Sequence, residues 1–248
     1  MKDKTIPSVV TNTLTAIGGL SGDPMTTVAT AFLAPIAVNV TENFLQRTLT
    51  SLQSDRLQLA FQKISYNFKC KNEKGKNIRT DKFMLNNDGE EAKQVLEGIL
   101  LNIQDEYEKK KVEYHANLFT NLCYDERVLF EQAICVSKII KEISYRQLCI
   151  IAYTYGQKNL KTSGWQARFK NFPILASYGD FYSELFHLEQ RGILQQDCPG
   201  QAIGGVPLKI SELGKIIFNE LSLEDLPLED VSLIGSLIDN INKVISGN

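Results

Sequence analysis

Two consecutive stretches near the start of the chain contain no charged side chain, and they limit the possible folds more than any other feature. They are residues 5–22 (TIPSVVTNTLTAIGGLSG) and 24–41 (PMTTVATAFLAPIAVNVT), each 18 residues long and separated only by Asp23. Exposing so much uncharged, apolar-rich chain to water is unfavourable. We therefore expect residues 5–41 to be covered, either by protein or by a membrane.

The length of each stretch is close to the lower limit for a membrane-spanning helix. The apolar side chains of residues 24–41 together favour insertion by about −2 to −4 kcal/mol. They are Val28, Phe32, Leu33, Ile36, Val38 and Val40. Threonines, Asn39 and two prolines oppose insertion, which brings the balance close to zero. The sequence favours a soluble protein that buries a helical hairpin, with membrane insertion conditional on its release by a partner or by oligomerisation.

Apolar residues recur at three- and four-residue steps through most of residues 1–142, which predicts amphipathic helices. The pattern covers residues 6–20, then continues from 28 to 64 with a kink at Pro35, and returns at 92–103, 114–122 and 128–140. Between them, the basic residues 69–82 predict a solvated loop or a short β-hairpin, and Asn87 or Asp88 is expected to cap the next helix. We predict that residues 1–142 form a helical bundle that includes the charge-free hairpin.

Residues 143–222 have a different organisation. A compact apolar helix begins after Ser144 and ends at Gly156, and a second helix, from residue 180, ends at Gly192. Glycine and proline then separate two short extended runs, which predict a β-hairpin, and Ser211 caps a further helix. The predicted fold is therefore mainly α, with a small β-hairpin near the C-terminus.

The order of these elements, with "L..RGIL" leading into the hairpin and "ISELGKIIF" following it, resembles a winged helix-turn-helix domain over about residues 143–221. This resemblance implies DNA binding. The helix that would enter the major groove, however, carries Asp180, Glu184 and Glu189 against Arg191, whereas such helices normally present basic or amide side chains. The candidate DNA contacts are four basic residues before that helix, Lys158, Lys161, Arg168 and Lys170. We favour a packing or protein-contact module, and keep a DNA-binding regulator as the alternative.

Residues 223–248 predict a C-terminal amphipathic helix with an unbroken apolar stripe. Its members are Val231, Ile234, Ile238, Ile241 and Ile245. We expect two surfaces to contact a protein partner, another copy or a membrane: this stripe, and the hairpin residues Val28, Phe32, Leu33, Ile36 and Val40. Docking on the protein's own core is the alternative for both surfaces.

No pattern in the sequence predicts catalysis, a metal or a cofactor. His115 and His187 are the only histidines, and neither has the additional ligands that a zinc site requires, so each is expected to be a partly buried helical residue. There is no Gly-x-Ser-x-Gly motif and no phosphate-binding loop. The adjacent carboxylates Asp105 and Glu106 are expected to be solvated. We therefore predict a protein that is not an enzyme.

The charged run and helix "DEYEKKKVEYHANLFTNLCYD", followed by "IIKEISYRQLCII", resemble the Abi-alpha type of bacterial abortive-infection proteins over about residues 91–151. The resemblance implies an anti-phage role inside a bacterial cell and transfers no catalytic residue. Five widely spaced cysteines and the lack of a secretory leader favour a cytoplasmic location, with peripheral or conditional association with the inner membrane. Lys+Arg 27 against Asp+Glu 29 argues against nucleic-acid binding as the main activity of the chain.

Overall fold

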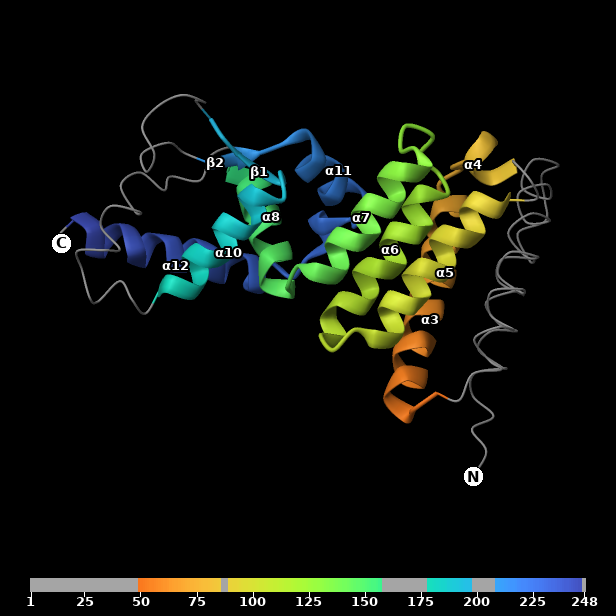
Figure 1. Ribbon diagram of the computed structural model, residues 1–248, viewed down its shortest axis with the longest axis horizontal. Coiled ribbons are helices and arrows are strands. Elements are labelled where there is room, and N and C mark those ends of the chain that lie inside the picture. Colours follow the sequence, from red (N-terminus) through yellow and green to blue (C-terminus); the bar gives the residue numbers. More distant parts are fainter. Residues whose placement is uncertain (1–48, 86–88, 158–177, 198–207, 247–248) are drawn as a thin grey trace. The chain divides into compact units, whose positions relative to one another are not determined.

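The computed structural model describes residues 49–85, 89–157, 178–197 and 208–246 (Figure 1). Helices hold 77% of these residues, and the described strands form one two-stranded antiparallel sheet, which confirms the mainly α fold class. The chain divides into two compact units, Met1–Glu142 and Ile143–Asn248.

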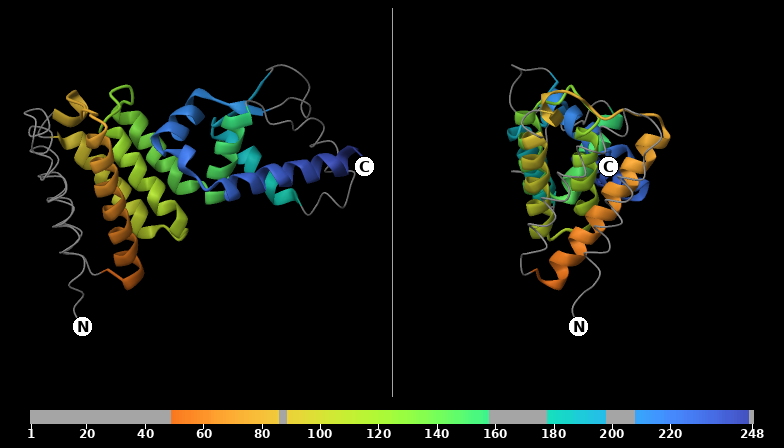
Figure 2. Two further views of the ribbon diagram at one scale, coloured as in Figure 1. Left: turned by 180° about the vertical axis from the view of Figure 1, so that it is seen from behind. Right: turned by 90° about the vertical axis from the view of Figure 1, so that its right-hand side faces the viewer.

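The first unit is built from helices that lie side by side (Figure 2). Its elements are α3 (Ser51–Glu73), α4 (Lys82–Leu85), α5 (Glu90–Asp105), the 3₁₀ turn η2 (Lys109–Lys111), α6 (Val112–Leu122) and α7 (Phe130–Glu142). Helix α6 is buried on almost all sides because α3, α5 and α7 all pack against it. Two of its polar side chains form hydrogen bonds: Asn67 Nδ2 donates to Asn117 Oδ1 at 2.8 Å, and the Thr120 hydroxyl donates to the Ala116 carbonyl at 3.0 Å.

Helix α3 begins with a capping box, which corrects the continuous helical pattern predicted for residues 28–64. Thr50 is extended, with φ −72° and ψ 160°, and its hydroxyl accepts the Gln53 backbone N–H at 3.3 Å. The Gln53 side chain accepts the Thr50 N–H in return at 3.0 Å. Because these two bonds satisfy N–H groups that a helix start leaves open, α3 begins at Ser51, and residues 49 and 50 are not helical.

The prediction of a loop or hairpin over residues 69–82 is wrong for its first part and its central arginine. Helix α3 continues to Glu73, and none of residues 69–82 is in a strand. Arg79 is buried, and its guanidinium donates to the carbonyls of Leu122, Asp125 and Val128 at 3.2, 2.7 and 2.9 Å. The buried charge is accommodated because its donors bond these carbonyls, at the end of α6 and beyond it, and pair with the Asp81 carboxylate.

Helix α5 does not begin with a side-chain cap. The residue before its first turn is Gly89, which has a φ of 75°, a conformation that favours glycine. Asn87 and Asp88, the predicted caps, lie outside the described residues. Glu90 and Glu91 occupy the first turn as predicted, where the helix dipole favours negative charge.

The second unit contains the described strands. Its elements are α8 (Tyr145–Gln157), α10 (Gly179–Gln190), β1 (Leu194–Gln196), β2 (Leu208–Ile210), α11 (Glu212–Glu220), the 3₁₀ turn η4 (Leu223–Asp225) and α12 (Leu228–Ser246). Strands β1 and β2 pair antiparallel, with Gln195 opposite Lys209. Helix α10 ends in a Schellman motif, in which the N–H of Gly192 (φ 70°) bonds the Glu189 carbonyl and that of Ile193 bonds the Leu188 carbonyl. This sharp stop turns the chain directly into β1.

Candidate functional site

One side of α3 has a large apolar residue at every second helical turn. Leu52, Leu59 and Tyr66 are spaced by seven residues, close to two helical turns, so they lie along one side of the helix. Leu52 is 64% exposed, Tyr66 is 62% exposed and Leu59 is half-buried. We call these three residues the α3 outer stripe. They present large apolar side chains to solvent along most of the helix.

The outer stripe lies opposite the side of α3 that packs into the first unit. The buried side chains of α3 are Leu57, Ala60, Phe61, Ile64 and Phe68, and α3 packs on α5 and α6. At about 100° per residue, the centre of the outer stripe lies about 155° around the helix axis from the centre of these residues. A surface helix needs one apolar face to join its core. Helix α3 also leaves this second set of apolar side chains outside the core, among Asp55, Arg56, Gln62 and Lys63, and the second set is the candidate contact surface.

A polar edge lies along the outer stripe. The ammonium group of Lys63 lies 6.0 Å from the centre of the Tyr66 ring, and Lys63 Nζ lies 3.6 Å from Glu113 Oε2 on α6. The lysine therefore has an acidic neighbour within its own unit. The exposed tyrosine can bury its ring against an apolar partner while its hydroxyl remains at the edge.

The predicted hairpin contacts lie outside the described residues. They are Val28, Phe32, Leu33, Ile36 and Val40. The described residues start at Leu49, and the first member of the outer stripe, Leu52, is in the first turn of α3. The outer stripe is therefore the described apolar surface that follows the charge-free residues most closely in the sequence.

The predicted contact stripe of α12 packs within the second unit. Ile234, Ile238 and Ile241 are 4%, 5% and 0% exposed, and α12 packs along α8. Val231 is half-buried, and the side chain of Ile245 is outside the description. The structure thus places the centre of this stripe in the core, which was the alternative. The exposed leucines of α12 are Leu228 and Leu233, at 83% and 65%.

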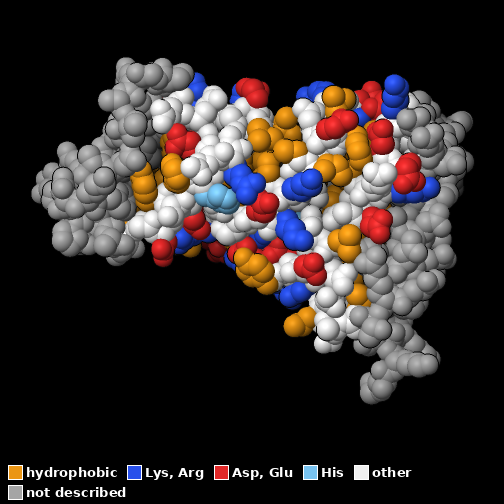
Figure 3. All heavy atoms as spheres, viewed as in Figure 1, with side chains coloured by type: hydrophobic (Ala, Val, Ile, Leu, Met, Phe, Trp, Pro, Cys, Tyr) orange, Lys and Arg blue, Asp and Glu red, His pale blue; other side chains and the backbone are white. Residues whose placement is uncertain are grey.

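The four basic residues predicted as DNA contacts, Lys158, Lys161, Arg168 and Lys170, lie outside the described residues. On α10, Glu184 accepts a hydrogen bond from Arg146 Nε at 2.6 Å and one from the Ser144 hydroxyl at 3.3 Å, so this carboxylate joins α10 to the start of α8. On the face shown in Figure 3, basic and acidic side chains are interspersed among hydrophobic ones. That distribution is unlike the continuous basic surface that phosphate neutralisation requires.

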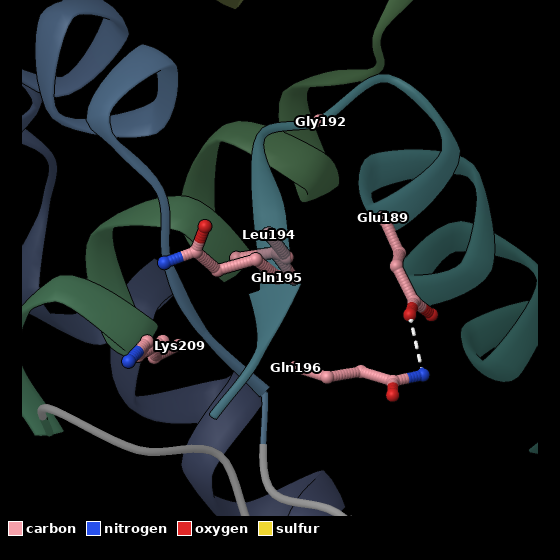
Figure 4. A pocket seen from close by; sticks show the side chains of 6 residues that line it. All are labelled: Glu189, Gly192, Leu194, Gln195, Gln196 and Lys209. Carbon is pink, nitrogen blue, oxygen red and sulfur yellow. Dashed lines mark hydrogen bonds between the residues drawn. The ribbon is translucent and has the colours of Figure 1, made fainter. Parts of the chain in front are cut away.

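A hollow of about 460 Å³ lies beside the sheet (Figure 4). It is lined by Glu189, Gly192, Leu194, Gln195, Gln196 and Lys209. Glu189 accepts a hydrogen bond from Gln196 Nε2 at 2.9 Å, and Lys209 pairs with Asp197 at 2.8 Å. Both charged groups of the lining are therefore engaged with neighbouring side chains.

A buried ionic cluster joins α5 to α6. It consists of Glu106, Lys111 and His115, which are 4%, 1% and 0% exposed. Lys111 Nζ lies 2.7 Å from Glu106 Oε2, and His115 Nε2 lies 3.4 Å from the same oxygen. The other carboxylate oxygen accepts the backbone N–H of Glu108 at 2.9 Å. The expectation that Glu106 is solvated is therefore wrong, because these donors compensate for its burial.

The cluster shifts the pKa values of two of its members. Burial by itself would raise the pKa of Glu106, but hydrogen bonds from His115, Lys111 and the Glu108 backbone outweigh burial and lower it from 4.5 to about 2. Burial lowers the pKa of His115 below 6.5, and the hydrogen bond to Glu106 offsets only part of this shift. Near neutral pH, Glu106 is therefore a carboxylate and His115 a neutral imidazole.

The tautomer of His115 follows from this geometry. Because the neutral ring donates to Glu106 from Nε2, its Nδ1 is the unprotonated nitrogen, and no described residue donates a hydrogen bond to it. These side chains are almost completely enclosed. Their arrangement holds the end of α5 against the start of α6, and it does not present a reactive group to solvent.

Comparisons with known proteins return no relative: no family model, no curated protein and no solved structure matches the chain. Among the described residues, no group of three or more His, Cys, Asp and Glu is placed to hold a metal ion. Of the helices that the structure describes, none combines the length and the apolar character needed to cross a membrane.

Sequence reasoning missed both the outer stripe and the buried cluster. The predicted helical pattern places Leu52 on one face with Leu57, Phe61 and Ile64, although the seven-residue spacing of Leu52, Leu59 and Tyr66 could have separated two faces. Glu106 and Lys111 belong to a charged run that is usually solvated. The feature of the sequence that could have indicated the cluster is the four-residue spacing of Lys111 and His115, which places a lysine and an imidazole on one helix face.

Proposed function

We propose that this chain is a non-enzymatic interaction protein of bacterial cells that acts in defence against phages. Residues 5–41 are its contact segment, which binds a protein partner or a second copy and enters the membrane when it is released. The winged-helix-like module and the C-terminal helix serve as packing and protein-contact elements. The protein resides in the cytoplasm and reaches the inner membrane conditionally.

The observation that carries this proposal is the second apolar face of α3. Leu52 and Tyr66 remain 64% and 62% exposed after the opposite face of the helix has joined the core. Large apolar side chains that stay exposed along one side of a helix gain free energy when a partner buries them. It begins directly after a chain segment that itself requires cover, which supports an interaction role for both. The anti-phage role is supported by the Abi-alpha resemblance of residues 91–151.

Phage plating on bacteria that produce the chain tests this function. We expect plaque numbers to fall for at least one member of a phage panel, and Phe32→Lys to restore them by placing a charge in the contact segment. The matched control is Leu228→Lys, because Leu228 is 83% exposed and lies on α12. This variant should protect as well as the original chain. Equal plating with and without the chain, across the panel, contradicts the proposal.

Cell fractionation tests the conditional step. During infection, the chain is expected to move from the soluble fraction into the membrane fraction or into a complex of higher mass. The Phe32→Lys variant should stay soluble at its original mass, whereas Leu228→Lys should behave like the unmodified chain. A chain that protects cells but never changes fraction or mass would overturn the role of residues 5–41 while leaving the defence role in place.

A DNA-binding regulator is the second candidate. It is supported by the order α8, α10, β1, β2 and α11, in which an antiparallel strand pair follows two described helices. The test is retention on DNA at low salt, with Arg168→Ala/Lys170→Ala expected to weaken it. Lys215→Ala is the control, since Lys215 already pairs with Glu212 at 2.6 Å. Failure of the unmodified chain to bind DNA contradicts this alternative.

A further inference from the structure

We propose that the α3 outer stripe is the docking surface for residues 5–41 of the same chain, and that this intramolecular contact keeps the contact segment covered in the resting protein. The inference rests on the proposed role of residues 5–41. It adds the surface on which they dock and the reason that their activity is conditional.

The outer stripe has the dimensions of a helix-docking surface. Leu52 and Tyr66 are separated by 14 residues, which corresponds to about 21 Å along the axis of α3. The stripe points away from α5 and α6, since it lies opposite the buried residues of the helix. Three large side chains lie along it at two-turn intervals, with Arg56 and Lys63 between them.

The charge-free residues can reach this surface. Nine residues, 42–50, separate Thr41 from the start of α3. Fully extended, they span about 30 Å, which is enough to bring residues 24–41 alongside the helix. An 18-residue run in helical form is about 27 Å long and so covers the whole outer stripe. Either charge-free run therefore has sufficient length to cover it.

The side chains of the two surfaces are chemically compatible. Residues 24–41 combine large apolar side chains such as Phe32 and Ile36 with many alanines and threonines. Small residues let a helix approach its neighbour closely, and the large ones fill the spaces between Leu52, Leu59 and Tyr66. Neither charge-free run contains a charged group that docking would have to desolvate.

Attachment to the same chain favours this occupant over a second copy. A short flexible connection holds a tethered segment at an effective concentration of the order of millimolar. A free partner with the same contacts must compete against that concentration, so it displaces the segment only when its own affinity is higher. Docking on α3 thus provides a physical basis for release by a partner.

Photo-crosslinking from the outer stripe tests the inference in the full chain. Tyr66→p-benzoylphenylalanine places the reactive group in the stripe, and Leu52→p-benzoylphenylalanine is an independent second position. Tyr107→p-benzoylphenylalanine is the matched control, because Tyr107 is an 80% exposed tyrosine of the first unit outside α3. All of these substitutions are at exposed side chains, so the core is kept intact. The products are separated by mass and mapped by peptide sequencing.

We expect both stripe positions to crosslink to residues 5–41 within the monomer, and the control to give no such product. Crosslinks found only between chains would overturn the inference, because they would show a second copy on the stripe. Crosslinks that never include residues 5–41 would also overturn it. Phage plating reports the proposed function independently, so a chain that protects cells without the intramolecular crosslink refutes the docking surface alone.

Discussion

Helices α3 and α12 are the two longest described helices, and they use their apolar residues differently. The apolar stripe of α12 packs inside its own unit, where Ile234, Ile238 and Ile241 are buried and the helix lies against α8. Helix α3 buries one face and keeps a second, with Leu52 and Tyr66 exposed. The difference shows that an apolar stripe becomes informative about partners only after the protein's own core has been accounted for.

The two units also differ in how they enclose charge. The first unit buries the connected cluster of Glu106, Lys111 and His115, as well as Arg79. Among the described side chains of the second unit, the buried charged residue is Glu220. Helix packing in the first unit therefore depends partly on compensated charges. In the second unit it depends mainly on close apolar contacts, such as that of α12 with α8.

The largest expected effect tests whether α12 is core. We expect Ile241→Asp to lower the free energy of unfolding of the second unit by about 4 kcal/mol or more, because it buries an uncompensated carboxylate. Ile241→Val should cost only about 0.5–1.5 kcal/mol. Chemical denaturation followed by hydrogen exchange of α8 amides measures both changes. An unchanged stability in Ile241→Asp would show that α12 is a free surface and would remove the contrast with α3.

The second prediction concerns the buried cluster. Glu106→Gln removes the nearer of the two carboxylates of Lys111, at 2.7 Å, and leaves Glu108 at 3.8 Å, so it should cost the first unit about 3 kcal/mol. Adding Lys111→Met removes the poorly compensated lysine, so the double variant should regain much of that loss. Hydrogen exchange of α6 amides in the full chain provides the measurement. Additive losses in the double-mutant cycle would mean that the two charges are not coupled.

The third prediction is the acid sensitivity of the first unit. The lowered pKa of His115 makes the unit lose stability as pH falls below 6.5, since the unfolded chain binds that proton more readily. The pKa of Glu106, about 2 in the folded protein against 4.5, adds a loss of roughly 3 kcal/mol between those pH values. Glu106→Gln/Lys111→Met should flatten the curve below pH 4.5. A double variant with the original acid dependence would contradict this assignment.

A smaller effect compares two helical glycines. A Cβ at Gly235 of α12 would lie 2.9 Å from Cε2 of the Tyr153 ring on α8, whereas nothing lies within 4 Å of one at Gly98 of α5. Gly235→Ala should therefore destabilise the second unit by about 1–3 kcal/mol. Gly98→Ala should stabilise the first unit by about 0.5–1 kcal/mol. Thermal unfolding of both variants checks the opposite signs.

Much of the local structure was predictable because it depends on neighbouring residues. The buried residues of α5 are the six of the predicted stripe, and the Ser211 cap, the stop at Gly192 and the paired strands are all confirmed. The predictions were wrong where contacts between residues far apart in the sequence determine which side chains are buried. Arg79 is buried because backbone carbonyls near the end of α6 accept its hydrogen bonds. Glu106 is buried because Lys111 and His115 lie close enough to compensate its charge. The spacing of residues within a helix does not specify either partner.

In the candidate site, too, the sequence predicts which residues are apolar but not what covers them. Periodicity identified the apolar residues of α12, but it could not decide whether a partner or α8 covers them, because both give the same spacing. It also joined both faces of α3 into one pattern. Only the packing of α3 on α5 and α6 separates the residues that build the core from Leu52, Leu59 and Tyr66.

Hydrogen–deuterium exchange of residues 5–41 in the full chain tests the central claim most directly. Leu52→Asp/Tyr66→Asp should leave the exchange of α6 unchanged but accelerate that of residues 5–41 by about tenfold or more, since the docked segment loses its apolar cover. The matched control is Leu228→Asp/Leu233→Asp, which places the same charges on the exposed leucines of α12 and should change neither region. Equal exchange of residues 5–41 in the original chain and in the α3 variant would contradict the account.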